Sequence, residues 1–378
     1  MRCSSFLPIL ALLVTSTVSL AQQDAPKPVK GAESDVKVKK DKSAPLTPEE
    51  IETAKRRSDR LFAPEAPLEF TLAADFKSAF RSRDTLKVKM TKASLTVKDS
   101  SGNPVTVPVE ISPRGHFRLR NDVCSFPPIR IVFPKSGLKG TPLAGQNALK
   151  LGTHCQNRDK EFHEYPVREH AAYQILNMMT DVSFRSRLAN VRYVQDGDAD
   201  TTTRLGLLIE DESDMSRRNG ARVQTVRGGT FGDMDPTQMA IISVFAYFVG
   251  NTDWSLYSLH NMRLLTTADG RYLPVPYDFD WSGVVYARYA KPDPRIGTKT
   301  VQERVYRGPC FSQADLAPIL AKFQSQRPAI NALYARLPLE ESYRRRASDY
   351  YKEFYEVIAD QRQVRREFID ACVGRATS

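Results

Sequence analysis

The stretch from Gly250 to Gly283 constrains the fold most, because a loop and a hairpin follow one another there without a gap. Apolar runs flank Asp269-Gly270, a dipeptide that favours a two-residue type I′ hairpin turn. With that turn, Pro274 and Pro276 fall at non-hydrogen-bonded positions of the ladder, where a residue without an N–H is tolerated. The two prolines therefore agree with a hairpin in this register.

The same register brings oxygen ligands together at the open end of the hairpin. Asn261 is expected to face Asp278 directly, with Cβ atoms roughly 4.5–5.5 Å apart. Asp253 precedes the hairpin, and Asp280 follows Asp278 closely. Ligand sets made of oxygen alone suit Mg²⁺ or Mn²⁺. The sequence therefore predicts a metal site formed by Asn261, Asp278 and Asp280, with Asp253 beside it.

The composition is that of a folded, basic protein. Of the 378 residues, 41% are hydrophobic and 26% are charged, which fits one large domain or two ordinary ones. The formal net charge of +11 favours anionic partners such as nucleotides, acidic proteins, nucleic acid or an anionic envelope surface, without choosing among them. Tyrosines recur at helical spacing near the C-terminus, which favours a packed stripe over a nucleic-acid site. We therefore expect no nucleic-acid partner.

The N-terminus predicts export. Residues 1–21 contain an early Arg2, an apolar core from Phe6 to Val18 and a final Ser19-Leu20-Ala21, which together are typical of a cleavable signal peptide. The apolar core is too short for a comfortable membrane span, and no other apolar run reaches membrane length. We therefore expect a secreted or periplasmic protein without a transmembrane segment.

Four cysteines lie beyond the predicted signal peptide. An even number of cysteines in an exported chain predicts disulfides, and the pairs nearest in sequence are Cys124 with Cys155 and Cys310 with Cys372. Four unpaired buried thiols are the alternative. No CxxC motif or His/Cys cluster indicates a zinc site.

The chain divides into segments of different character. Residues 22–65 predict a disordered linker and a short helix, and residues 66–212 predict a β-rich N-terminal lobe that carries one helix, Pro166–Met179. Residues 213–335 predict a C-terminal lobe with a buried helix, the loop and the hairpin, and residues 336–378 predict a C-terminal helix. A β-rich lobe followed by a helical lobe is the plan of a protein kinase, so the sequence predicts an α+β, bilobal fold.

Several short motifs follow one another in a distinctive order. The earlier ones, in chain order, are Arg114-Gly115-His116, Leu149-Lys150-Leu151, Val167–Ile175 and Gly206–Glu210. The later ones are GNTD and HN in the loop and PYDFD at the end of the hairpin. This order, over about residues 105–290, resembles that of the CotH family of atypical protein kinases, named after a spore coat protein.

The resemblance implies an atypical protein-kinase-like bilobal fold and a kinase active site. Asp253 would accept the proton of the attacking hydroxyl or orient that hydroxyl. Asn261 and Asp278 would hold the Mg²⁺ or Mn²⁺ ion that bridges the phosphates of ATP. Asp280 would be a second metal ligand or a support.

The resemblance also implies a set of nucleotide contacts. Lys150 would contact phosphates and pair with Glu169 of the following helix. Glu210 would lie near the adenine, and Arg114 would be a further phosphate contact. The family usually has a Pro-Lys-Lys-type strand where this chain has Pro-Pro-Ile-Arg, so either Arg130 substitutes or a contact is missing.

The resulting hypothesis is an exported CotH-like kinase that transfers the γ-phosphate of ATP to hydroxyl groups of a protein substrate, with Mg²⁺ or Mn²⁺. Two alternatives remain open. One is a kinase-like envelope or surface protein that binds a partner without catalysis. The other is a metal-dependent phosphoester hydrolase or nucleotidyl transferase that uses the same acidic cluster.

Overall fold

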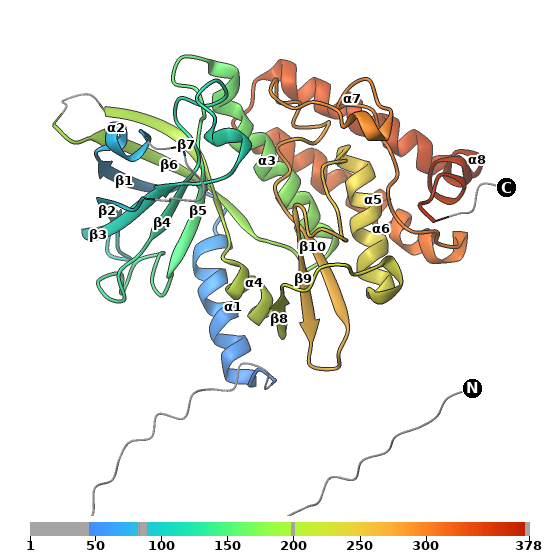
Figure 1. Ribbon diagram of the computed structural model, residues 1–378, viewed down its shortest axis with the longest axis horizontal. Helices are drawn as coiled ribbons and strands as arrows, with labels where there is room; N and C mark the ends of the chain where they lie inside the picture. The colour runs from blue at the N-terminus through green and yellow to red at the C-terminus, as the bar shows by residue number, and fades with distance from the viewer. Residues whose placement is uncertain (1–44, 82, 84–88, 198–200, 375–378) are drawn as a thin grey trace, which may run out of the picture. The chain divides into compact units, whose positions relative to one another are not determined.

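The computed structural model describes residues 45–81, 83, 89–197 and 201–374. The predicted signal peptide, residues 1–21, lies outside the described residues, as do residues 22–44 of the predicted linker. The described residues form a closed barrel, a helical part and a second, smaller sheet (Figure 1).

Seven strands of the described chain close into a barrel, in the order β1-β2-β3-β4-β5-β7-β6. Neighbouring strands are antiparallel except β1 and β6, which run parallel and complete the ring. Apolar residues such as Leu72, Leu95 and Ile111 fill the interior, because alternate side chains of each strand point inward. The strands are β1 (Leu68–Ala74), β2 (Thr91–Lys98), β3 (Pro104–Pro113), β4 (Ile129–Val132), β5 (Ala148–Gly152), β6 (Ser186–Gln195) and β7 (Thr201–Ile209).

Helices α1 and α2 pack at opposite ends of the barrel (Figure 1). The first, α1 (Pro48–Phe62), begins with a capping box, and Leu61 in its last turn belongs to the barrel core. The second, α2 (Phe76–Ala79), follows the end of β1 directly, and its Phe76 belongs to the same core. Both ends of the barrel interior are therefore closed by apolar side chains.

The helical part packs around one buried helix, α5 (Pro236–Val249). Asp235 caps its N-terminus, and Gly250 ends it in the left-handed conformation, with φ +67°. Nearly every residue of α5 is buried, because α3, α6, α7 and the hairpin strand β10 pack against it. The remaining helices are α3 (Lys160–Met179), α4 (Glu212–Arg218), α6 (Gln313–Arg336), α7 (Glu341–Ala359) and α8 (Gln361–Val364).

A second sheet, of order β10-β9-β8, carries the predicted hairpin. The hairpin is confirmed, but its expected register is wrong by one residue, because the turn contains Ala268, Asp269 and Gly270 instead of two residues. Asn261 consequently faces Tyr277 instead of Asp278. The strands are β8 (Ala221–Gln224), β9 (Met262–Thr267) and β10 (Tyr272–Pro276).

The two prolines of β10 could not reveal this error. Arg271 occupies a hydrogen-bonded position whether the turn has two residues or three, and hydrogen-bonded positions alternate along β10 from there. Pro274 and Pro276 therefore occupy non-hydrogen-bonded positions in both registers, and their placement does not distinguish a two-residue from a three-residue turn.

The predicted bilobal, protein-kinase-like fold is wrong, although the mixture of helices and strands is confirmed. The strands expected in a kinase-type N-terminal lobe do not form such a lobe. The parallel pairing of β1 with β6, from Leu68 opposite Ala189 to Ala74 opposite Gln195, closes them into a barrel.

Two helices differ from their expected bounds. Helix α3 begins earlier than Pro166, because Asp159 caps it, and the proline lies inside the helix at the cost of one backbone hydrogen bond. The expected single C-terminal helix is interrupted at Asp360, which ends α7 and caps α8.

Both predicted disulfides are confirmed. Cys124 pairs with Cys155, and Cys310 pairs with Cys372. Disulfides persist in oxidising compartments, so the two pairs indicate a protein that works outside the cytoplasm. Within the described residues, none of the helices has the length and apolar character needed to cross a membrane.

Candidate active site

The loop that carries Asp253 leaves the buried end of α5 in a fixed direction. Gly250 has a positive φ, and an added Cβ there would collide with the hydroxyl of Tyr350, so the position requires glycine. Asn251 follows, and its Oδ1 accepts the backbone N–H of Asp253 at 3.0 Å. These contacts place the Asp253 carboxylate on a rigid base.

Two side chains hold the carboxylate of Asp253. Nδ2 of Asn261 donates to Oδ2 of Asp253 at 2.9 Å and to the Asp253 backbone carbonyl at 2.9 Å. Nε2 of His260 lies 2.8 Å from Oδ1. The Asp253 side chain is still 33% exposed, so a substrate can reach it. The structure therefore brings together the predicted base and one predicted metal ligand.

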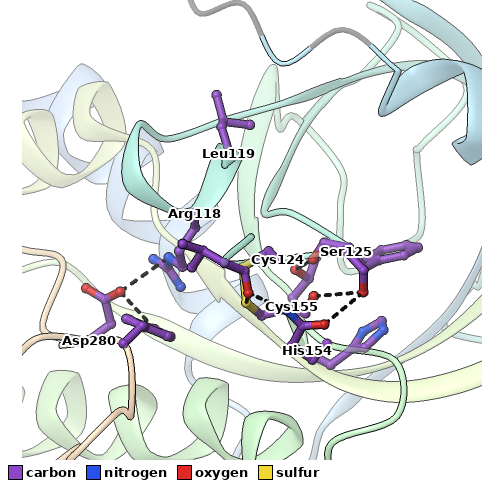
Figure 2. The surroundings of a disulfide bond; sticks show 12 residues. Arg118, Leu119, Cys124, Ser125, His154, Cys155 and Asp280 are labelled. Carbon is purple, nitrogen blue, oxygen red and sulfur yellow. Dashed lines mark hydrogen bonds and ion pairs between the residues drawn. A yellow bond between two sulfur atoms is a disulfide. The ribbon is translucent and has the colours of Figure 1, made fainter. Parts of the chain in front are cut away.

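Asp278 and Asp280 share one guanidinium, that of Arg118. Nη2 of Arg118 lies 3.0 Å from Oδ1 of Asp278. Nε of Arg118 lies 3.3 Å from Oδ2 of Asp280, and Figure 2 shows the guanidinium directed at this carboxylate. Glu169 of α3 completes the group, with Oε2 at 3.8 Å from Nη1 of Arg118. Three carboxylates thus surround one permanent positive charge; together these four side chains are called the acidic cluster below.

Tyrosine hydroxyls fix the end of β10 beside the acidic cluster. The backbone N–H of Asp278 donates to the hydroxyl oxygen of Tyr173 at 2.9 Å, and the hydroxyl of Tyr289 donates to Asp280 at 2.9 Å. Asp278 has φ +63° and Asn261 has φ +48°. Left-handed backbone at a residue other than glycine is uncommon and concentrates at functional sites.

With all three of its carboxyl groups ionised, the acidic cluster would hold more negative than positive charge. Burial raises the pKa of Glu169 and of Asp280, and the neighbouring carboxylates add to the rise although Arg118 opposes it. Oε1 of Glu169 is buried and has no hydrogen-bond partner among the described residues. A proton or a further cation is therefore needed to neutralise the cluster.

A row of cations lies on the outer face of the barrel. Arg130 of β4 and Lys150 of β5 are direct cross-strand partners, and their strand neighbours Ile129 and Leu151 point into the barrel core. Arg114 follows the end of β3, and its charge acts on the pKa of both Lys150 and Glu169. Because the charge of Asp278 also acts on the pKa of Lys150, Arg114 and Lys150 adjoin the acidic cluster.

Lys150 lies in a partly apolar setting. Its Nζ is 5.4 Å from the ring centre of Tyr277 and 5.9 Å from that of Phe184. Burial lowers the pKa of Lys150 from 10.5 to about 8, and the charge of Arg114 adds to the effect. No carboxylate of the described chain forms an ion pair with Lys150. An anionic ligand would supply the missing partner.

Glu210, predicted to lie near an adenine, has a structural role instead. It is fully buried, and Arg218 contacts its two oxygens at 2.8 and 3.0 Å. The hydroxyl of Ser58 and the backbone N–H of Arg185 donate to the same carboxylate. Glu210 therefore ties α1 and α4 to the end of β7 and stands apart from the acidic cluster.

Sequence reasoning missed Arg118, the cation at the centre of the acidic cluster. It lies in RGHFRLR, where three arginines compete and no local signal separates them. Arg118, and not Lys150, is the ion-pair partner of Glu169. Also missed were Glu212 and Arg263, which pair at 2.6 Å and whose charges act on Lys150.

The oxygen atoms of Asp278 and Asn261 suit a divalent metal ion that a bound phosphate also helps to hold. Among the described residues, no three Asp, Glu, His or Cys side chains are arranged to bind a metal ion by themselves. Mg²⁺ at phosphate-transfer sites commonly takes one or two carboxylates and leaves its other positions to phosphates and water. The Asp278 side chain is 32% exposed, and the unpartnered oxygen of Glu169 marks excess negative charge behind it. Asp278, with Asn261 nearby, therefore fits a metal that arrives with a phosphate.

No protein-family model matches the chain, and no curated protein matches it significantly. The function is therefore inferred from the residues of the site.

Proposed function

We propose that the protein is an exported phosphotransferase that resembles the CotH kinases in its chemistry and not in a bilobal fold. It would transfer the γ-phosphate of ATP to a hydroxyl group of a protein substrate, with Mg²⁺ or Mn²⁺. One observation carries the proposal: an exposed, oriented carboxylate and unpaired cations adjoin the same acidic cluster. The charge of Asp253 acts on Asp280, and the charge of Asp278 acts on Lys150.

Asp253 is the base of the proposed reaction. Asn261 and His260 hold its carboxylate, and the exposed part of the side chain is free to meet a substrate hydroxyl. Asp253 would accept the hydroxyl proton while the hydroxyl oxygen bonds to the γ-phosphorus and the bond to the bridging oxygen of ADP breaks. The products are ADP and a phosphoester on the substrate.

Lys150, Arg114 and Arg130 would bind the phosphates of the nucleotide. Phosphoryl transfer depends on positioning and charge neutralisation more than on covalent chemistry. With a pKa of about 8, Lys150 keeps its proton at neutral pH and offers a positive charge that no carboxylate of the described chain pairs with. A bound phosphate would raise this pKa again.

Asp278 and Asn261 would hold the metal ion, which when bound would neutralise charge on the phosphates. Arg118 positions Asp278 and Asp280 from behind, and Glu169 positions Arg118 in turn. Export through residues 1–21, to the periplasm or outside the cell, is part of the proposal. N-terminal sequencing of the mature protein would test it, with a new terminus after Ala21 expected.

A second candidate is a non-catalytic binding protein, and Arg118 is the observation that favours it. Its guanidinium contacts both Asp278 and Asp280 and so supplies the positive charge that a metal ion would bring. In this alternative the acidic cluster is a structural ion-pair network, and the neighbouring cations bind an anionic partner.

A transfer assay distinguishes these functions. The protein is incubated with ATP labelled at the γ-phosphate, Mg²⁺ and a mixture of exported proteins, and the products are separated. Labelled protein and ADP that disappear in Asp253→Asn, but persist in the turn variant Asp269→Asn, support the proposal. Binding of ATP without any product would point to the binding protein. Labelled free phosphate would point to the hydrolase. Labelled pyrophosphate, with AMP attached to protein, would point to the nucleotidyl transferase.

A further inference from the structure

A cavity lies at the mouth of the barrel and shares no residue with the acidic cluster. β1 and β6 end at this mouth, β7 begins there, and α2 packs against it (Figure 1). The cavity has a volume of about 560 Å³, which is within the range of small-molecule sites, and barrel mouths are a common place for such sites.

Aromatic rings form much of the cavity wall. The ring of Phe126 is central, with its centre 4.8 Å from Phe80, 4.8 Å from Tyr193 and 5.3 Å from Phe76. The imidazole of His154 stacks on Phe126 at 4.7 Å. A wall of this kind favours a flat, apolar ligand body over a branched one.

Three polar groups of the wall lack partners. Nδ1 of His154, the hydroxyl of Tyr193 and Nε of Arg204 are buried, and none has a hydrogen-bond partner among the described residues. Nε2 of His154 bonds Oδ1 of Asn157 at 2.7 Å, which makes Nε2 the protonated nitrogen and leaves Nδ1 as an acceptor. Burial lowers the pKa of His154 to about 4, so the ring stays neutral and keeps this tautomer. A ligand that bonds these groups would remove the cost of leaving them unpaired.

The charge of the wall is positive. Lys77, Arg83 and Arg204 line the cavity, and no Asp or Glu is among its described lining residues. The guanidinium of Arg83 donates hydrogen bonds to backbone carbonyls such as those of Leu119 and Cys124. Nε of Arg204, in contrast, has no hydrogen-bond partner among the described residues. An acidic group on the ligand would therefore pair with Arg204.

Other polar side chains of the wall are already engaged. Ser125 bonds Gln156, and Gln195 bonds Asp75 at 3.0 Å. A sugar needs many free donors and acceptors around its hydroxyls, and this wall does not offer them. The unused groups match one acid group and one or two hydroxyl or N–H groups on a flat ring.

We propose that the barrel-mouth cavity binds a small planar aromatic acid that carries a ring hydroxyl or N–H. The ring lies against Phe126, the acid group pairs with Arg204, and the ligand hydroxyl donates to Nδ1 of His154 and accepts from the hydroxyl of Tyr193. The proposal is independent of phosphoryl transfer, because the cavity and the acidic cluster share no residue.

Titration calorimetry with 4-hydroxybenzoate tests the proposal on the purified protein with both disulfides formed. Saturable binding is expected, at least about tenfold weaker with 4-hydroxybenzyl alcohol, which lacks the acid, and none with cellobiose. Arg204→Gln and Tyr193→Phe should each weaken binding at least about tenfold. Tyr193→Phe keeps the ring packing and removes an unpaired hydroxyl, so its melting temperature should not fall, which separates lost binding from lost folding.

Several results would overturn the assignment. Absence of saturable binding of 4-hydroxybenzoate to the wild type would remove the site. Unchanged affinity in both variants, or displacement of the probe by ATP, would place the probe outside the barrel mouth. Binding of cellobiose in preference to the aromatic acid would assign the cavity to another ligand class.

Discussion

Replacing Lys150 by methionine is predicted to stabilise the protein while removing a proposed phosphate contact. The pKa of Lys150 falls from 10.5 to about 8 on folding, which corresponds to a cost of about 3 kcal/mol for the charged form. Its cation–π contacts with the rings of Tyr277 and Phe184 offset about 1 kcal/mol of this cost. Methionine has a similar unbranched shape and no charge, so Lys150→Met should raise the free energy of unfolding by about 2 kcal/mol at pH 7.

The stability gain should depend on pH, with a sign fixed by the direction of the pKa shift. The pKa of Lys150 is lower in the folded state than in the unfolded state, so between about pH 8 and 10.5 the unfolded wild type binds more protons. Wild-type stability therefore rises relative to the variant across this window. The advantage of Lys150→Met should be full below about pH 8 and mostly lost by about pH 10.

Urea unfolding of both proteins at pH 7 and pH 9.5, followed by tryptophan fluorescence, measures this difference. Lys98→Met is the matched control, because Lys98 is exposed at the end of β2 and its replacement should change stability by less than about 0.5 kcal/mol. A variant that is less stable than the wild type at pH 7, or a gain of equal size at both pH values, would refute the reasoning.

Three further predictions concern the stability of the fold around the site. Arg118→Met strands the carboxylates of Glu169, Asp278 and Asp280 and should cost about 3–5 kcal/mol at pH 9 in urea unfolding. The deficit should shrink toward pH 6, because burial raises the pKa of Glu169 to about 8 and that of Asp280 to about 7, so protonation removes the stranded charges; a deficit independent of pH would contradict this explanation. The double variant Cys124→Ser, Cys155→Ser opens a loop with a sequence separation of 31 and should lose about 4 kcal/mol, and a loss below about 1 kcal/mol would contradict it. Gly250→Ala should cost at least about 3 kcal/mol of unfolding free energy, because the added Cβ meets a positive φ and also collides with Tyr350. Gly270→Ala has the strained φ but open space around the Cβ, so it should cost about 1–2 kcal/mol. Equal losses in chemical denaturation would refute the collision.

Local signals predicted much of the helical part but not the barrel. The Asp235 cap, the apolar run of α5 and the glycine after it are contiguous, so the helix could be read directly. The first half of β6 has a weak strand pattern, because it contains Arg187 and Asn190 and lacks strict alternation. The parallel pairing of β1 with β6 joins segments far apart in the chain, and no turn between them marks it. Barrel closure therefore has no local sequence signature.

The candidate site was predicted in part and for a partly wrong reason. Asp253 and Asn261 do meet, but through hydrogen bonds across the loop and not through the expected hairpin register. Arg118 determines how Asp278 and Asp280 are held, yet it reaches them from a 3₁₀ turn between β3 and β4. A contact that a long side chain makes between elements far apart in the chain leaves no spacing pattern in the sequence.

The central claim is that Asp278 and the neighbouring cations bind a metal–nucleotide complex. Titration calorimetry of ATP, with and without Mg²⁺, tests it most directly on the wild type and on Asp278→Asn. We predict saturable binding that requires Mg²⁺ and weakens at least about tenfold in Asp278→Asn, equivalent to about 1.4 kcal/mol. A cooperatively folded wild type that binds no ATP in the presence of Mg²⁺, or that binds ATP equally well without Mg²⁺ and in the variant, would contradict the claim.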